Sequence, residues 1–411
     1  MTSSRCRLCG EPLEHVVADL GMTPISNDYV QADRLDSMEP YYPLCAYVCE
    51  HCLLVQVGDF TPREEIFAAD YAYFSSYSTS WVEHARRYVD AVAERFDPAE
   101  VVEIASNDGY LLRWFVERGV PVLGVDPTAG TAAAAEKQGV PTVVEFFGRE
   151  LAERLATTHT PDLMIGNNVL AHVPDLNDFV GGFRRLLAPH GVVTFEFPHL
   201  VRLIEEGQFD TIYHEHFSYF SLLSASRVLA AHGLVVFDVE ELPTHGGSLR
   251  VYARHVENDA LAVCERVHDL LARERAGGYD TLEPYLRFAE RVRADKRRLL
   301  EFFVAAKEAG KTIAAYGAPA KGNTLLNYCA IGTDFIDFTV DLNPAKQGRF
   351  LPGTHIPIDA PERLAAERPD LIFLLPWNLR DELSEQLAYT RDWGGRLVVR
   401  APNAEAGVEV L

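Results

Sequence analysis

The strongest constraint on the fold of this chain is a regular alternation of strand-like and helix-like segments in its middle part. Short apolar strands are predicted at 101–105, 122–126, 142–146, 162–167 and 192–197, and a stretch of helical character follows each of them. Alternation of this kind is typical of βαβ units, in which helices cover both faces of a parallel sheet. The pattern therefore predicts an α/β domain built on a doubly wound sheet.

The order of elements changes after the fifth strand. A helix is predicted at 224–232, and two strands at 234–239 and 248–255 follow it with no helix between them. A run of βα units closed by a helix and a hairpin predicts an antiparallel strand inserted at the end of the sheet. This topology resembles the Rossmann-like fold of class I methyltransferases.

The last part of the chain repeats the α/β pattern on a smaller scale. It begins with a charged helix at 282–309. Strands are then predicted at 311–316, 338–341, 355–358, 371–375 and 396–400, with helices at 320–330, 361–367 and 379–387. This alternation predicts a second, smaller Rossmann-like α/β domain. With a length of 411 residues, we expect three domains, at 1–67, 68–277 and 278–411.

The first of these domains holds five of the seven cysteines. Cys6 and Cys9 form one C-x-x-C pair and Cys49 and Cys52 form a second, which leaves Cys45 as a spare. Two such pairs are what a tetrahedral thiolate zinc site needs, because each tight turn presents two sulfurs. Four protein ligands leave no open position, so we expect a structural zinc ion. The alternative is four free thiols, although so small a segment rarely builds a stable core without a metal ion or a disulfide.

Composition and charge exclude several classes of protein. With 48% hydrophobic and 24% charged residues, the chain has the composition of an ordinary folded protein. The 38 Lys and Arg against 60 Asp and Glu leave a net charge of −22, which repels polyphosphates and disfavours a nucleic-acid partner. No run approaches the ~20 apolar residues of a membrane span, and the start lacks a signal-peptide pattern. We therefore expect a cytoplasmic protein with no membrane partner.

A turn of small and polar residues follows the first strand of the middle domain. Such a turn between a strand and a helix lets a ligand bind backbone N–H groups at the carboxyl edge of the sheet. Asp126 ends the next strand and could accept hydrogen bonds from both hydroxyls of a ribose, the alternative being an ordinary helix cap. Together the two sites predict an adenosine pocket. Its candidate residues are Glu103, Ala105, Asn107, Asp108, Gly109, Asp126 and Asn167.

The densest group of chemically active side chains is the segment Tyr-His-Glu-His-Phe-Ser-Tyr-Phe-Ser at 213–221. It supplies a proton acceptor near neutral pH, a group to orient that acceptor, and donors for a developing oxyanion. His214 and His216 lack the i, i+4 spacing of a helical zinc pair, and the alternative is a hydrogen-bonded aromatic turn. Asn168 and His172 follow the fourth strand and are expected to face the same crevice.

A third group lies in the last domain, where Tyr-Gly-Ala-Pro-Ala-Lys-Gly-Asn occupies 316–323. A turn of small residues with a lysine resembles a phosphate cradle, although it is not a Walker A motif. The loops at 71–77 and 244–250 are also rich in hydrogen-bond donors. For both loops, a role in turns and packing is as good an interpretation as a functional role. The candidate substrate contacts outside the middle sheet are Tyr77, Tyr316, Lys321 and Asn323.

With these motifs in order, the whole chain resembles the sugar C-methyltransferases of deoxysugar and antibiotic biosynthesis. The similarity covers the cysteine pairs, the Glu-Ile-Ala-Ser-Asn-Asp-Gly loop, the Tyr-His-Glu-His cluster, the His-Gly-Gly-Ser-Leu-Arg loop and the Tyr-Gly-Ala-x-Ala-Lys-Gly-Asn turn. The resemblance implies S-adenosylmethionine as methyl donor in the middle domain. It also implies a dTDP-4-keto-6-deoxy sugar as substrate, with Lys321 facing its diphosphate. Pro319 departs from the smaller residue expected there, and we expect a monomer.

The resemblance also implies roles for individual residues. His216 would be the general base that removes the proton from carbon 3, beside the ketone at carbon 4. Tyr213 and Glu215 would position the sugar or its enolate, and Asn168 and His172 would line the same pocket. This agrees with the chemistry of the residues, because a C–H beside a carbonyl becomes acidic enough only if the enolate oxygen is stabilised.

Other functions remain open from the sequence. Methylation at carbon 5 would use the same apparatus, whereas methyl transfer to oxygen or nitrogen of another metabolite would need no enolate. A catalytically inactive nucleotide-sugar binding protein is a further alternative, against which the intact loop at 103–109, Asp126 and His216 argue. A zinc-dependent nucleic-acid modifier is disfavoured by the net charge of −22.

Overall fold

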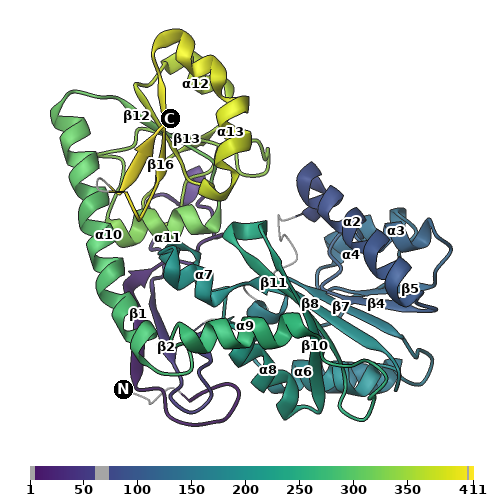
Figure 1. The fold of residues 1–411 in the computed structure, drawn as a ribbon. Helices are drawn as coiled ribbons and strands as arrows, with labels where there is room; N and C mark the ends of the chain where they lie inside the picture. The colour runs from purple at the N-terminus through teal and green to yellow at the C-terminus, as the bar shows by residue number, and fades with distance from the viewer. Residues whose placement is uncertain (1–4, 61–73, 405–406) are drawn as a thin grey trace.

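The computed structural model describes residues 5–60, 74–404 and 407–411. Within these ranges the strands form three sheets, and Figure 1 follows the chain through them from purple at the N-terminus to yellow at the C-terminus. The expected domain boundary between residues 67 and 68 lies outside the described residues. None of the described helices has both the length and the apolar character needed to cross a bilayer.

The central sheet has seven strands in the order β10-β11-β8-β7-β4-β5-β6. They are β4 (Val101–Ile104), β5 (Val122–Val125), β6 (Thr142–Val143), β7 (Leu163–Asn167), β8 (Val192–Pro198), β10 (Leu234–Leu242) and β11 (Ser248–His255). Strands β4 to β8 are parallel, whereas β11 is antiparallel to both of its neighbours. The predicted antiparallel insertion is confirmed. The strand predicted at 142–146 ends at Val143, because β5, the strand it pairs with, ends at Val125.

Helices cover both faces of this sheet, as predicted (Figure 1). One hydrophobic cluster joins α2 (Thr79–Phe96), α3 (Arg113–Val116) and α4 (Ala129–Lys137) to one face. A second cluster joins α5 (Arg149–Leu155), α6 (Leu176–Leu186), α8 (Leu222–Ala231) and α9 (Glu265–Ala276) to the other. Helix α8 begins directly after the 213–221 segment because the hydroxyl of Ser221 accepts from the N–H of Ser224 at 3.1 Å, which caps the helix.

The N-terminal sheet was not predicted as a set of strands. It consists of β1 (His15–Thr23), β2 (Tyr42–Val48), β3 (Val55–Val57) and β9 (Ser218–Tyr219), in that order. All of its neighbouring strands are antiparallel. Because β9 comes from the 213–221 segment, this sheet joins the cysteine-rich start of the chain to the predicted catalytic cluster.

The third sheet has the order β14-β13-β12-β15-β16-β17. Its elements are β12 (Ile313–Tyr316), α11 (Ala320–Cys329), β13 (Thr339–Val340), β14 (Ile358–Asp359), α12 (Glu362–Glu367), β15 (Leu371–Leu374), α13 (Arg380–Gln386), β16 (Arg396–Arg400) and β17 (Val408–Val410). Strand β17 is antiparallel to β16 and was not predicted. The strand predicted at 355–358 begins only at Ile358, because His355 has φ +54 and cannot extend a strand.

The long helix α10 (Glu283–Glu308) runs from the N-terminal sheet to the C-terminal part, as Figure 1 shows in green. One hydrophobic cluster links it to the N-terminal sheet, to α7 (Leu200–Glu205) and to the third sheet. The described 3₁₀ turns are η1 (Ala32–Arg34), η2 (Ser75–Tyr77), η3 (Leu170–His172), η4 (Phe209–Thr211), η5 (Thr244–Gly246), η6 (Trp377–Leu379) and η7 (Ala388–Trp393).

A buried ion cluster joins the C-terminal part to the segment before the catalytic cluster. Arg400, at the end of β16, lies 3.1 Å from a carboxylate oxygen of Asp210 and 3.4 Å from one of Asp295, and it donates to the carbonyl of Gly207. The indole N–H of Trp377 donates to the other oxygen of Asp210 at 2.6 Å. Asp210 therefore holds both β16 and η6 against the middle of the chain.

We expect Arg400→Met to lower the free energy of unfolding by about 3–5 kcal/mol, because it leaves the buried carboxylate of Asp210 without its cation, whereas Asp295 keeps its pair with Arg298. Urea unfolding followed by circular dichroism measures the change. Arg297→Met is the matched control, since Arg297 is exposed and pairs with the exposed Glu290, and it should cost less than about 0.5 kcal/mol. Equal stability of Arg400→Met and the control would contradict a structural role for this ion cluster.

Candidate active site and metal centre

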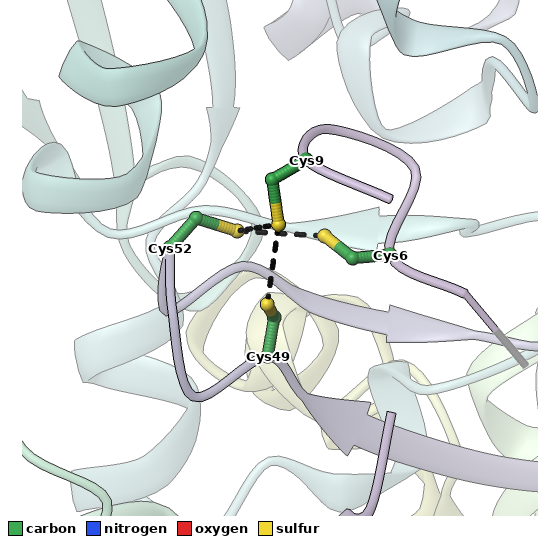
Figure 2. A group of neighbouring side chains, drawn as sticks. All are labelled: Cys6, Cys9, Cys49 and Cys52. Carbon is green, nitrogen blue, oxygen red and sulfur yellow. Dashed lines mark hydrogen bonds between the residues drawn. The ribbon is translucent and has the colours of Figure 1, made fainter. Parts of the chain in front are cut away.

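The two C-x-x-C pairs converge on one point, as Figure 2 shows. The four sulfurs lie within 4.8 Å of one another. The shorter separations are 3.4 Å between Cys6 and Cys52 and 3.5 Å between Cys9 and Cys49. A tetrahedral site with Zn–S bonds of about 2.3 Å requires sulfurs about 3.8 Å apart, so the cluster matches a zinc ion in size. Cys45 lies on β2 and outside the cluster.

Tight turns produce this geometry. The N–H of Gly10 donates to the carbonyl of Cys6 at 2.9 Å, and the N–H of Leu53 donates to the carbonyl of Cys49 at 2.8 Å. Gly10 and Leu53 directly follow the second cysteine of each pair, and their positive φ of +77 and +60 reverses the chain there. The amide of Gln56 donates to the sulfur of Cys6 at 3.3 Å, as the outer partner of a metal thiolate does.

The loop after β4 has the backbone of a ligand-binding turn. Ala105, Asn107 and Gly109 have φ of +57, +50 and +77. Left-handed conformations at residues other than glycine cost energy and are concentrated at functional sites. A Cβ at Gly109 would lie 3.2 Å from Ala135 of α4, so only glycine allows this close approach of loop and helix.

Several buried polar atoms at the carboxyl edge of the central sheet have no hydrogen-bond partner among the described residues. They are Oε2 of Glu103, Oγ of Ser106, Oδ1 of Asp108 and Oδ1 of Asn167. Burial raises the pKa of Glu103 well above its usual range, and the carboxylates of Asp126 and Asp108 raise it further. Because buried polar groups are normally paired, this set indicates a polar ligand. S-adenosylmethionine fits it, since its ammonium and hydroxyl groups are donors.

Asp126 already makes several bonds within the chain. Its Oδ2 accepts from the N–H of Asn107 at 3.0 Å, and its Oδ1 accepts from the N–H of Thr128 at 3.0 Å and from the hydroxyls of Thr128 and Thr131. The carboxylate therefore joins the loop after β4 to the start of α4. Oδ2 keeps a lone pair for a further donor, and the predicted bond to a ribose stays a prediction.

The hydrogen bonds of His216 define its tautomer. Nδ1 lies 3.1 Å from the carbonyl oxygen of Thr211, and because a carbonyl only accepts, Nδ1 carries the proton. Nε2 is then the acceptor for the hydroxyl of Tyr213 at 2.8 Å. Burial lowers the pKa of His216 well below its usual range, and His172 lowers it further. The imidazole is therefore neutral at pH 7, with a basic lone pair on Nε2.

Two more imidazoles surround this base. The ring of His172 lies 4.6 Å from that of His216, centroid to centroid. The amide nitrogen of Asn168 lies 3.3 Å from Nε2 of His245. The ring of His245 lies 5.2 Å from that of Trp81, centroid to centroid. Burial lowers the pKa of both His172 and His245 to about 4. The structure thus brings together the 213–221 segment, η3 and the loop at 244–250.

A buried ion network that sequence reasoning missed supports the 244–250 loop. Glu196 of β8 accepts from His84 at 2.9 Å, from Arg250 at 2.6 Å and from the hydroxyl of Thr244 at 3.0 Å. Burial raises the pKa of Glu196, but the bond from His84 and the charge of Arg250 outweigh this and hold it at about 2. Glu196 is a single carboxylate between apolar residues of a strand, and such a carboxylate needs a buried partner. The sequence therefore offered a sign of this network.

The carboxyl group of Glu215 is buried, with 4% of the residue exposed. The amide nitrogen of Asn27 donates to its Oε1 at 3.0 Å, whereas Oε2 has no partner within the described part of the chain. Burial raises the pKa of Glu215 to about 7, although hydrogen bonds from Asn27 partly oppose this. Asn27 lies in the loop after β1, and no motif in the sequence pointed to it.

Lys321 lies at the start of α11, at the carboxyl edge of the third sheet. Its ammonium group donates to the side-chain oxygen of Asn378 at 2.5 Å and lies 4.7 Å from the ring centroid of Trp377. Burial lowers the pKa of Lys321 to about 8. The Lys321 charge in turn lowers the pKa of His216 and of His245. The predicted diphosphate turn therefore faces the imidazoles.

The remaining substrate candidates are in different surroundings. Asn323 is buried and donates to the carbonyl of Ser26 at 2.6 Å. Tyr316 is buried in the core of the C-terminal part, and Tyr77 is 70% exposed beside the loop after β4. Residues 71–73 of the 71–77 loop lie outside the described residues. Substrate binding by these three candidates stays a prediction.

Comparison with known proteins identifies the family. Three family models match, described as "Putative zinc binding domain" over residues 6–67, "Methyltransferase domain" over 80–239 and "C-methyltransferase C-terminal domain" over 243–402. C-methyltransferase NovU of Streptomyces niveus is 39% identical over 404 residues, which are 97% of this chain and 95% of that protein. The chain belongs to the C-methyltransferase family.

Two further similarities cover less of this C-methyltransferase at lower identity. The ubiquinone biosynthesis O-methyltransferase of Rhodopseudomonas palustris (strain BisA53) is 23% identical over 157 residues, 32% of this chain and 62% of that protein. Among solved structures, the 1,6-didemethyltoxoflavin-N1-methyltransferase of Burkholderia thailandensis is 19% identical, with a TM-score of 0.36 over 50% of this chain and 96% of that chain.

Family membership and the site agree on the two cofactors. This C-methyltransferase is an S-adenosylmethionine-dependent enzyme, and its four-cysteine cluster is a zinc site. Glu103, Asp108 and Asn167 have buried oxygens without a partner among the described residues, and their binding of the methyl donor stays a prediction. The donor supplies an electrophilic methyl group when bound.

We expect the purified C-methyltransferase to contain one zinc ion per chain and Cys52→Ser to lose it, because three thiolates bind the ion more weakly than four. Inductively coupled plasma mass spectrometry measures the metal content. Cys45→Ser is the matched control, because Cys45 belongs to the same segment but lies outside the cluster. Full zinc occupancy in Cys52→Ser would contradict the tetrathiolate site.

Proposed function

We propose that this C-methyltransferase methylates carbon 3 of a dTDP-4-keto-6-deoxy sugar through an enolate that His216 generates. The observation that carries the proposal is the state of His216, a buried neutral imidazole with its proton on Nδ1 and its basic Nε2 beside the hydroxyl of Tyr213. A carbon acid requires such a base to form an enolate, whereas methyl transfer to an oxygen or nitrogen nucleophile needs no enolate.

The proton moves from carbon 3 to Nε2 of His216, and the electron pair of the broken C–H bond forms the enolate. The carbonyl of Thr211 stabilises the resulting imidazolium, because Nδ1–H already donates to it. Because the lone pair of Nε2 accepts from Tyr213 in the structure, the hydroxyl must leave Nε2 before the proton arrives. It can then donate to the oxygen at carbon 4, where negative charge develops. The enolate carbon would then bond to the methyl group as the methyl–sulfur bond of S-adenosylmethionine breaks. S-adenosylhomocysteine would leave as a neutral thioether, and His216 would pass its proton to solvent.

Glu215 and Lys321 hold the two ends of the proposed substrate. The groups that hydrogen-bond to the carboxyl of Glu215 are donors, which suits a carboxylate, and its Oε2 is available to a sugar hydroxyl. Lys321 offers a cation to the diphosphate. Binding the donor on the central sheet and the nucleotide at the third sheet would hold the two reacting carbons in line.

The proposal includes a single chain acting in the cytoplasm. The base, the carboxylate and the lysine all come from one chain, so no second copy is needed to complete the site. A thiolate zinc site is typical of a reducing compartment. Methylation at carbon 5 would use the same base and remains an outcome of the test below.

Incubation of the enzyme with dTDP-4-keto-6-deoxyglucose or its 2-deoxy analogue in heavy water should exchange the hydrogen at carbon 3, and S-adenosylmethionine should add the methyl group there. His216→Asn should lower both rates by about 10³-fold, within the range of general-base catalysis, with donor affinity unchanged. Nuclear magnetic resonance of the sugar and mass spectrometry measure the two reactions.

His214→Asn is the control for this experiment, because the Nε2 of His214 faces the carbonyl of Pro43 at 3.2 Å instead of Tyr213. Exchange at carbon 5 would move the proposed site of methylation. Methylation of an oxygen or nitrogen acceptor without any exchange would refute the enolate route.

The turnover number should rise as the pH increases through about 7, because Glu215 is protonated below its pKa of about 7 and loses its acceptor character. His216, whose pKa lies far lower, is already neutral in this range. Glu215→Gln should lower the turnover number by about 10- to 100-fold, which corresponds to the free energy of a hydrogen bond to a charged group. The rise of the turnover number through about pH 7 should then disappear. If the same rise of the turnover number near pH 7 persisted in Glu215→Gln, another titrating group would be responsible for it.

A further inference from the structure

We infer that Asn27, in the loop of residues 24–29 that follows β1, is a positioning residue for the methyl transfer, because it holds the carboxylate of Glu215. The inference rests on the proposed function, which places Glu215 at the substrate. It gives the zinc-bearing N-terminal segment a part in the reaction, since Asn27 follows β1 of the sheet that begins there.

The contact with Glu215 has a defined orientation. The amide nitrogen of Asn27 lies 3.0 Å from Oε1 of Glu215, and the amide oxygen lies 3.3 Å from the hydroxyl of Tyr29. A carboxylate only accepts, so the amide cannot be reversed without losing its bond to Glu215. Asn27 is exposed whereas Glu215 is buried, which places this bond at the rim of the site.

Ser26 and Tyr29, which lie on either side of Asn27 in the loop, both hydrogen-bond to the C-terminal part. The carbonyl of Ser26 accepts from the side chain of Asn323 at 2.6 Å, and the hydroxyl of Tyr29 donates to the carbonyl of Ala318 at 2.5 Å. Ser26 and Tyr29 are themselves buried. The loop at 24–29 therefore links the carboxylate of Glu215 to the turn at 316–323, where we propose that the diphosphate binds.

The surroundings of Glu215 show why a neutral donor matters there. The charged and titratable groups that act on it or respond to it are Asp28, Tyr29, Tyr219 and His172, the last through a hydrogen bond to the main chain of Glu215. Asp28 carries the same charge as Glu215 and disfavours its ionised form. The amide of Asn27 opposes that effect by donating to the carboxylate, which keeps an acceptor in place for the sugar.

The test uses Asn27→Asp in the zinc-loaded, full-length enzyme. Aspartate has the shape of asparagine but cannot donate when ionised, and it adds a like charge beside Glu215. The titration of Glu215 is followed by ¹³C resonance of carboxyl-labelled glutamate, with the resonance assigned by its loss in Glu215→Gln. We expect the titration midpoint to rise by about one pH unit or more, as loss of a charge-assisted hydrogen bond predicts.

The kinetic readout is the pH dependence of turnover with dTDP-4-keto-6-deoxyglucose or its 2-deoxy analogue, whichever the wild type uses. The pH at which the turnover number rises should increase by the same amount as the titration midpoint of Glu215. The KM for S-adenosylmethionine should stay within twofold of the wild-type value. Ser26→Ala is the matched control, because it removes a hydroxyl from the same loop, 3.4 Å from that of Thr324, and leaves Asn27 intact. It should leave the midpoint of Glu215 unchanged. Asn27→Ala replaces Asn27→Asp if the latter fails to fold or to retain zinc.

An unchanged midpoint in Asn27→Asp overturns the inference and leaves the proposed function standing. A raised midpoint with an unshifted rate profile overturns the positioning role and also removes Glu215 from the proposed reaction. A raised midpoint with an equally shifted profile, absent in Ser26→Ala, supports it.

Discussion

The backbone of the 213–221 segment is held from two sides, and the rest of the site depends on this. Strand β9 pairs with β3 of the N-terminal sheet, and the N–H of Val57 extends the pairing to the carbonyl of Phe217 at 3.1 Å. On the other side, the N–H of Phe217 donates to the carbonyl of Ala171 at 2.7 Å, within η3. His216 therefore precedes a residue whose two main-chain groups are both bonded, one to each neighbouring part of the molecule. The cysteine cluster adjoins the same sheet, because Gln56 of β3, which pairs with Ser218, donates to the sulfur of Cys6.

Burial is the main cause of the chemistry in this site. It raises the pKa of Glu215, lowers that of Lys321 and lowers that of His216 still further. Desolvation disfavours every charged form, so the pKa of the acid Glu215 rises to about 7 and that of the base Lys321 falls to about 8. The buried ion pairs of Glu196 with Arg250 and of Asp210 with Arg400 have a different role, because they hold loops in place.

The α/β architecture could be predicted from the sequence because local patterns specify it. Strands of the central sheet are apolar runs between helical stretches, and their order alone indicated the antiparallel insertion. The N-terminal sheet could not be predicted in this way. Strand β1 is irregular, with register shifts between Val16 and Ala18 and between Asp19 and Met22, and β9 is only two residues long. The strand expected at 355–358 was displaced by the left-handed backbone of His355, which no residue pattern signals.

The sequence by itself determined which groups are available for chemistry, because the cysteine pairs, the Tyr-His-Glu-His cluster and the lysine turn are short segments with recognisable composition. Only the tertiary structure decided how these groups meet and what supports them. Asn27 reaches Glu215, and Trp377 reaches Asp210, across large separations in the chain. Contacts of this kind depend on how sheets and helices pack, and packing leaves no periodic trace in one sequence. The same holds for protonation, since burial is a property of the folded chain and decides which imidazole is a neutral base.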